Sequence, residues 1–182
     1  ITAAVVDYEG YGLSSGKPTE AGCYRNVHRL YDWLMTERGF APTNIVVLGF
    51  SIGTGPAVEL AATRPVGGLI LEEPYLSAPR IRTRVRLLPQ DPFPNIARIG
   101  RVSAPKMIIH GTADAIVPFC QGQALFAAAP EPKKFVPVPG AGHLDFIAHL
   151  GIENYHALIR DFIVTGRVEE PHERMKITGF SE

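Results

Sequence analysis

The chain has 182 residues, 46% hydrophobic and 20% charged, and its 18 basic residues balance its 18 acidic ones. This length suits one globular domain with a sizeable core, and the composition excludes a disordered chain. The neutral charge argues against a nucleic-acid-binding protein. The longest apolar runs have strand length, so no stable membrane insertion is expected. Two cysteines, Cys23 and Cys120, are too few for a disulfide scaffold and are compatible with a reducing compartment, and a cytoplasmic location is expected.

Apolar runs of strand length alternate with segments of helical periodicity. Strands are predicted at residues 2–7, 45–49, 66–71, 106–110 and 133–138. Helices are predicted between Thr19, a candidate N-cap, and Gly39, and at residues 52–63, 122–129 and 155–164. This alternation predicts an α/β fold with a mostly parallel sheet flanked by helices.

Two segments depart from this pattern. Residues 73–104 are rich in Pro and Arg and poorly periodic, which predicts a short cap inserted over the sheet. Residues 166–182 are polar and charged and are predicted to form a C-terminal tail after a core of residues 1–165. The chain opens on Ile1, without Met, inside an apolar run, which predicts an N-terminally truncated domain.

The pentapeptide Gly49-Phe50-Ser51-Ile52-Gly53 fits the G-x-S-x-G pattern between a predicted strand and a predicted helix. In this context the pattern indicates a tight turn that presents a nucleophilic serine at the carboxyl edge of the sheet. Glycine is expected at both flanking positions because side chains there would clash with the neighbouring strand and helix. The strand before and the helix after favour a functional turn over a chance match.

Two further residues follow later strands and reach the same edge of the sheet. Asp114 comes after the strand at 106–110, and His143 comes after the strand at 133–138. The chain order Ser, Asp, His is that of α/β-hydrolase triads. We expect His143 to accept the Ser51 proton, and Asp114 to orient the imidazole ring.

The remaining candidates are weaker. His110 lies within a predicted strand and is expected to be a packing residue, and the other histidines lie in or near predicted helices. The histidines and cysteines show no metal-ligand spacing, so no metal is predicted. Glu73, after the third strand, is an alternative acid position that could assist Asp114. Tyr11 and Phe119, both on loops at the catalytic edge, are candidates for the substrate pocket.

Residues 7–14, 49–53, 110–118 and 139–145 together resemble the α/β-hydrolase superfamily, and most of all its branch of alpha/beta hydrolase domain-containing proteins 17 and 13, also called BEM46-like. The resemblance covers nearly the whole chain up to about residue 164. It implies a serine hydrolase that cleaves a small carboxylic ester or thioester through an acyl-enzyme, without a cofactor. A serine peptidase of the same fold is the alternative activity.

The resemblance also implies elements ahead of residues 2–7. In the family, a His-Gly strand and loop supply one backbone N–H of the oxyanion hole, and the residue after the nucleophile, here Ile52, supplies the other. Without that loop, the alternative is a catalytically impaired scaffold with half of its oxyanion hole. Without that strand, residues 2–7 and 45–49 either pair directly or leave an open edge, which predicts a homodimer or a complementing chain there.

Overall fold

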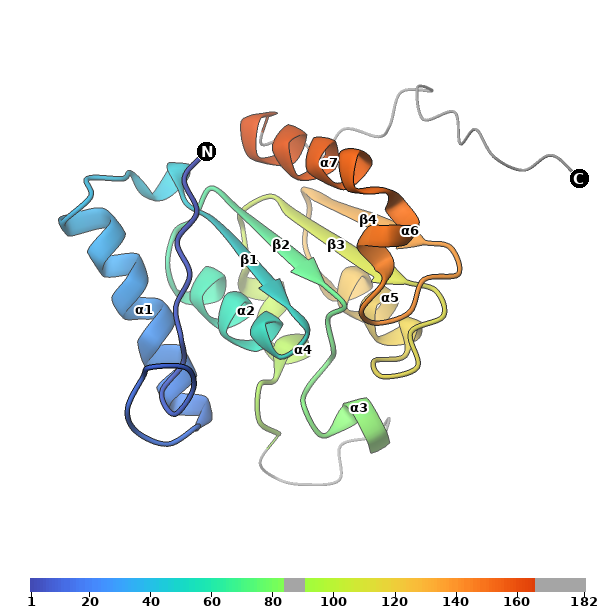
Figure 1. Cartoon of the computed structure of the whole chain (residues 1–182), viewed down its shortest axis with the longest axis horizontal. Helices are drawn as coiled ribbons and strands as arrows, with labels where there is room; N and C mark the ends of the chain where they lie inside the picture. The colour runs from blue at the N-terminus through green and yellow to red at the C-terminus, as the bar shows by residue number, and fades with distance from the viewer. Residues whose placement is uncertain (84–90, 166–182) are drawn as a thin grey trace, which may run out of the picture.

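The computed structural model describes residues 1–83 and 91–165. Within them lies a parallel sheet whose strands are adjacent in sequence order, β1-β2-β3-β4 (Figure 1). The strands are β1 (Val46–Phe50), β2 (Gly68–Glu72), β3 (Lys106–Gly111) and β4 (Lys133–Val138). The main helices are α1 (Glu20–Thr36), α2 (Thr54–Thr63), α5 (Phe119–Ala128), α6 (Phe146–Leu150) and α7 (Ile152–Thr165). The predicted α/β fold with a parallel sheet is confirmed.

Helices cover both faces of the sheet because the side chains of each central strand alternate between two apolar clusters. Leu69 and Leu71 of β2 pack with residues of α2 and α5, whereas Ile70 packs with residues of α6 and α7. The strands β2 and β3 are buried along their whole length. Helix α1 lies outside α2 (Figure 1), where Tyr31 packs on Leu60. Thr19 caps α1 as predicted, and its hydroxyl accepts a hydrogen bond from the Gly22 amide.

The prediction of a buried strand at residues 2–7 is wrong. These residues run without strand pairing, and Ile1 and Val5 are 88% and 90% exposed. An apolar run forms a strand only where a neighbouring strand completes its hydrogen bonds and packing covers its faces, and the described residues provide neither. Of the two expected arrangements, the structure has the open edge, because β1 pairs with β2 alone among the described strands. A partner at that edge stays a prediction.

The region predicted as a cap contains α3 (Arg80–Thr83), α4 (Asn95–Arg98) and a short 3-10 turn (Ile99–Arg101). Ile99 and Val102 are fully buried in the cluster that also holds α2, so the end of this region belongs to the core rather than to its surface. Residues 84–90 of the cap and the predicted tail at 166–182 lie outside the described residues. In the described part of the chain, no helix has the length and apolarity needed to cross a bilayer.

Candidate active site

Ser51 lies in a strained turn between β1 and α2. Its backbone φ is +48°, a left-handed conformation that costs free energy in a residue with a side chain. Gly49 makes the turn possible, because a Cβ there would lie 2.6 Å from the Gly53 carbonyl oxygen and 2.8 Å from Ala57 Cβ. Gly53 is different: a Cβ there would meet only the Tyr8 hydroxyl, at 3.9 Å. The expectation that both glycines are sterically required is therefore wrong for Gly53.

A network of buried hydrogen bonds fixes the backbone of the turn that carries Ser51. The Thr54 hydroxyl donates to the Ser51 carbonyl over 2.7 Å, and the Tyr75 hydroxyl donates to the Ile52 carbonyl over 3.2 Å. The Asn95 amide joins the two supports, donating to the Thr54 hydroxyl and to the Tyr75 carbonyl. Thr54, Tyr75 and Asn95 are all fully buried, so their hydrogen bonds fix the turn without competition from water.

Ser51, His143 and Asp114 form one continuous hydrogen-bonded row. His143 Nε2 lies 2.8 Å from Ser51 Oγ, and His143 Nδ1 lies 2.7 Å from Asp114 Oδ2. The carboxylate makes Nδ1 the protonated nitrogen, which leaves Nε2 free to accept the serine proton. The Phe50 ring lies against the imidazole, with centroids 5.3 Å apart. The three residues predicted from the sequence therefore converge, although 92 residues separate Ser51 from His143.

Asp114 is held as an anion. Burial opposes its charge, but hydrogen bonds outweigh burial and keep the pKa of this carboxyl below its ordinary value. The donors are Glu73, His143 and the backbone amides of Val117 and Ile116, with both amides 2.8 Å from Oδ1. An anionic Asp114 can orient the His143 ring and stabilise its protonated form.

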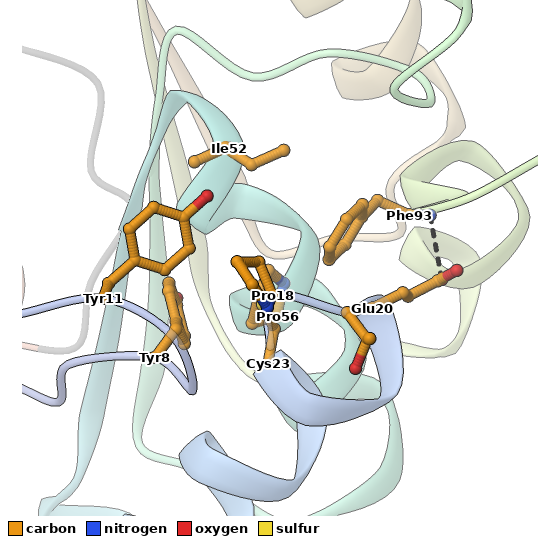
Figure 2. Close-up of a pocket in the computed structure, with 9 residues that line it drawn as sticks. Tyr8, Tyr11, Pro18, Glu20, Cys23, Ile52, Pro56 and Phe93 are labelled. Carbon is orange, nitrogen blue, oxygen red and sulfur yellow. Dashed lines mark hydrogen bonds between the residues drawn. The ribbon is translucent and has the colours of Figure 1, made fainter. Parts of the chain in front are cut away.

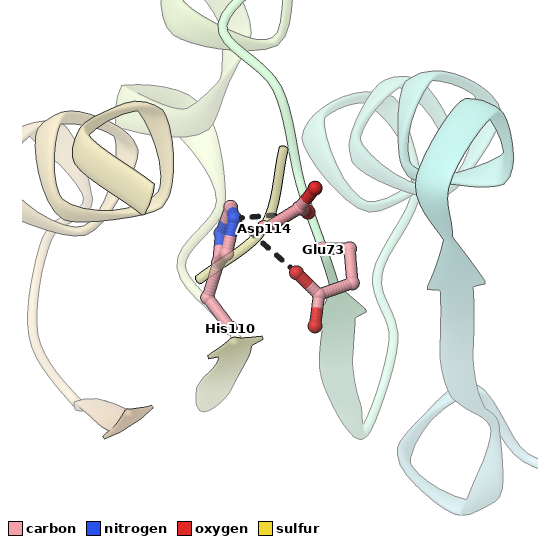
Figure 3. Close-up of side chains that lie close together, drawn as sticks. All are labelled: Glu73, His110 and Asp114. Atoms are coloured by element: carbon pink, nitrogen blue, oxygen red, sulfur yellow. Dashed lines mark ion pairs between the residues drawn. The ribbon is translucent and has the colours of Figure 1, made fainter. Parts of the chain in front are cut away.

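Two buried groups lie behind Asp114, as Figure 3 shows: Glu73 and His110. His110 Nε2 lies 3.2 Å from a Glu73 oxygen and 3.4 Å from an Asp114 oxygen, and it donates to the Val117 carbonyl over 2.9 Å. Burial lowers the pKa of His110, so this imidazole is neutral. The cluster has the residue types of a metal site. However, its ligand atoms already serve protein hydrogen bonds, because His110 Nε2 carries a proton and Asp114 Oδ2 faces His143.

A cavity of about 420 Å³ opens beside the turn (Figure 2). It reaches Ile52, the residue after Ser51, and most of its walls are apolar. Its lining residues come from the N-terminal loop, α1, α2 and the loop before α4: Tyr8, Tyr11, Pro18, Thr19, Glu20, Cys23, Ile52, Pro56 and Phe93. The Glu20 carboxylate fixes one wall by accepting a hydrogen bond from the Phe93 amide over 2.9 Å.

Of the two residues predicted for the pocket, Tyr11 lines this cavity and Phe119 does not. Phe119 packs instead on the edge of His110 and against Phe135, below the catalytic edge. Sequence reasoning missed Cys23, Pro56 and Phe93, which come from three separate segments. No local pattern marks them, because the cavity exists only where those segments meet. Glu73 was marked by its place after a buried strand, which is the same signal that marked Asp114.

The order of the strands, the helices on both faces and the strained serine turn define an α/β hydrolase fold. The chain has this fold, and the resemblance seen in its sequence is confirmed by curated relatives that carry the alpha/beta hydrolase name. It is 41% identical over 141 residues to alpha/beta hydrolase domain-containing protein 17B of Homo sapiens, covering 76% of this chain and 49% of that protein. It is 39% identical over 142 residues to protein 17C of Homo sapiens, covering 76% and 43%. The chain thus spans about half the length of the curated relatives it matches.

Solved structures give the same fold. An esterase of Pyrococcus furiosus superposes with a TM-score of 0.71 at 18% identity, over 87% of this chain and 68% of that one. A monoacylglycerol lipase of Paleococcus ferrophilus superposes with a TM-score of 0.67 at 20% identity, over 88% and 82%. No protein-family model matches the chain.

Proposed function

We propose that the chain is a serine hydrolase that cleaves carboxylic ester or thioester bonds through an acyl-enzyme on Ser51. The observation that carries this proposal is the unbroken row of hydrogen bonds from Ser51 through His143 to Asp114, with lengths of 2.8 and 2.7 Å. A hydroxyl is a poor nucleophile unless a base takes its proton as it attacks, and this row supplies the base and the group that orients it.

In the proposed reaction, Ser51 Oγ forms a bond to the acyl carbon while its proton passes to His143 Nε2. The tetrahedral intermediate collapses as the bond to the leaving oxygen or sulfur breaks, and His143 returns the proton to that atom. Water then attacks the acyl-enzyme with His143 again as base, which releases the acid and restores Ser51. Asp114 stays ionised throughout and stabilises the protonated imidazole.

The tetrahedral intermediate carries a negative oxygen that needs hydrogen-bond donors. The backbone N–H of Ile52 is a candidate, because it lies at the start of a helical segment, where amides have no partner within the helix. The second donor expected from the family resemblance comes from a loop ahead of residues 2–7. An impaired scaffold remains the alternative on this point, since one missing donor costs roughly a hundred- to a thousand-fold in turnover.

Labelling with a fluorophosphonate probe tests the nucleophile directly. We expect the wild-type chain to be labelled at Ser51, and to release chromophore in a burst from a short acyl ester. Ser51→Ala should give neither signal. Ser103→Ala is the matched control, because Ser103 is exposed and far along the chain from the turn, and it should be labelled like the wild type. An unlabelled wild-type chain would point instead to the non-catalytic scaffold.

The apolar cavity supports an apolar acyl chain as the part of the substrate bound beside Ser51. Each buried methylene contributes about 0.8 kcal/mol, so kcat/KM should rise roughly fourfold per methylene from acetyl to butyryl esters. Cys23→Phe would fill the cavity and should remove this rise while leaving acetyl ester hydrolysis within about threefold. Cys120→Phe is the matched control, because Cys120 is exposed and outside the cavity.

A flat profile across acyl lengths in the wild type would contradict this use of the cavity. Including amide substrates in the same panel separates the esterase from the peptidase alternative, because both would use Ser51 in the same way.

A further inference from the structure

The Glu73 side chain points towards Asp114, which ends the hydrogen-bonded row that starts at Ser51 and passes through His143. Glu73 follows β2 directly, and its φ is +50°, which is uncommon for a residue with a side chain. Strained backbone of this kind persists only where the surrounding structure holds it, and it gathers at functional sites. Here the Glu73 amide donates to the Ile109 carbonyl over 3.0 Å, which ties the strained residue to β3. The carboxyl group thereby lies fully buried between β3 and the Asp114 loop.

Among the described residues, the polar groups around the Glu73 carboxyl come from β2, from β3 and from the loop that carries Asp114. The Gly111 amide donates to it over 2.9 Å, and an Asp114 carboxyl oxygen lies within 4.8 Å of a Glu73 carboxyl oxygen, with both groups next to the same His110 nitrogen. His110 Nε2 lies 3.2 Å away but donates its proton to Val117, so it brings no positive charge. Glu72, the preceding residue, adds further negative charge, and His143 lies beyond Asp114. The surroundings of Glu73 therefore contain carboxylates and no fixed cation.

Two fully buried carboxyl groups this close repel each other if both are ionised, and they can share a hydrogen bond only if one of them keeps a proton. Asp114 accepts hydrogen bonds from two backbone amides and from His143, all of which favour its ionised form. Glu73 has one amide donor and a fully buried side chain. The proton therefore belongs to Glu73. Burial first, and then the hydrogen bond to Asp114, raises the pKa of Glu73 to about 9.

We propose that Glu73 is a positioning residue of the active site, which acts as a neutral carboxylic acid donating a hydrogen bond to Asp114 from the side opposite His143. It touches no substrate. Its hydrogen bond holds the Asp114 carboxylate in the orientation that faces His143. Because Glu73 is neutral, no second buried negative charge lies beside Asp114. This inference rests on the proposed hydrolase function only in its kinetic consequence.

The kinetic consequence is an alkaline limit to activity. Once Glu73 loses its proton, two carboxylates lie side by side without water, and their repulsion displaces Asp114 from His143. We expect kcat of the wild type to fall at least tenfold with an apparent pKa of about 9, while KM changes little. In Glu73→Gln the amide donates at every pH, so the limit should move up by more than one pH unit, with kcat at pH 7 within about threefold of the wild type.

Glu72→Gln is the matched control, because Glu72 is also buried but bonds to the Tyr155 hydroxyl, away from the row. Its charge is the smallest of the causes that raise the pKa of Glu73, so this variant should shift the alkaline limit only slightly, and downwards, opposite to the shift expected for Glu73→Gln. An identical limit in the wild type and in Glu73→Gln, or no limit in the wild type, would overturn the proposal.

Stability measurements test the proton on Glu73 without any activity. The unfolded chain loses this proton near pH 4.5, whereas the native state keeps it until about pH 9. Between these values the native state binds more protons, so the free energy of unfolding falls as pH rises. Glu73→Gln should remove this part of the slope relative to the wild type. Asp114→Asn offers a second variant: it removes the neighbouring charge, so the slope should end at a lower pH. Equal slopes in all three proteins would show that Glu73 is ionised.

The activity measurements and the stability measurements distinguish failure of the hydrolase proposal from failure of the Glu73 proposal. An inactive, unlabelled protein that still shows the stability difference would refute the hydrolase proposal and leave the neutral Glu73 in place. An active enzyme without the stability difference would refute the role of Glu73 alone.

Discussion

Replacing Ser51 or His143 with alanine should lower kcat for ester hydrolysis by roughly 10⁴- to 10⁶-fold, and replacing both should cost little more than either alone. The reason is that the two residues act as one unit: without the base the hydroxyl is unactivated, and without the hydroxyl the base has no proton to accept. KM should change little, because neither side chain forms the wall of the apolar cavity.

Single-turnover assays of the two single variants and the double variant measure this directly. His149→Ala is the control, because His149 lies on α6 with its side chain 41% exposed and pairs only locally with Asp145. It should retain full activity. Multiplicative losses in the double variant would show that Ser51 and His143 act independently, contrary to the proposed mechanism.

The two glycines that flank the serine turn should respond in opposite ways to the same change. Gly49→Ala introduces a Cβ against the Gly53 carbonyl, in the turn that precedes α2, and against Ala57 of α2 itself. Such overpacking costs about 1–3 kcal/mol of unfolding free energy. Displacing α2 would also move Ser51 relative to His143, so we expect kcat to fall by at least tenfold, since small misplacements of reacting groups are costly.

Gly53→Ala provides the comparison within the same motif. Its φ is −65°, in the helical range, and the space around its Cβ is open. Alanine there should leave kcat within about threefold and raise stability by about 0.5 kcal/mol, because it restricts the unfolded chain. Denaturant unfolding of both variants gives the two free energies. Equal destabilisation by both substitutions would mean that the turn does not have the packing described above.

The convergence of Ser51, Asp114 and His143 was predictable because each of these residues follows a strand. Parallel strands bring their carboxyl ends to one edge, so the positions of Ser51, Asp114 and His143 after β1, β3 and β4 were enough to predict their convergence. Each helix and strand predicted after residue 19 also has a counterpart in the structure with bounds within three residues, and β4 has the predicted bounds. The short helix α6 went unpredicted, since five residues give too little periodicity to recognise.

The predictions from sequence were wrong or incomplete where packing between distant segments determines the structure. Residues 2–7 have the composition of a buried strand, yet composition cannot supply a neighbouring strand. Phe119 follows a strand at the catalytic edge, but its ring turns inward onto His110. The neutrality of Glu73 depends on its burial and on the hydrogen bonds that Asp114 receives from other residues, none of which appears in the local sequence.

The sequential order of the strands has a consequence for synthesis of the protein. Each strand pairs with the strand made immediately before it, so the sheet can grow in the direction in which the ribosome extends the chain. The serine turn follows the first of these strands, whereas the histidine follows the last, 92 residues later. In the proposed mechanism, a nascent chain therefore carries the Ser51 hydroxyl without its base until the residues after β4 have been made, so the serine is not activated during synthesis.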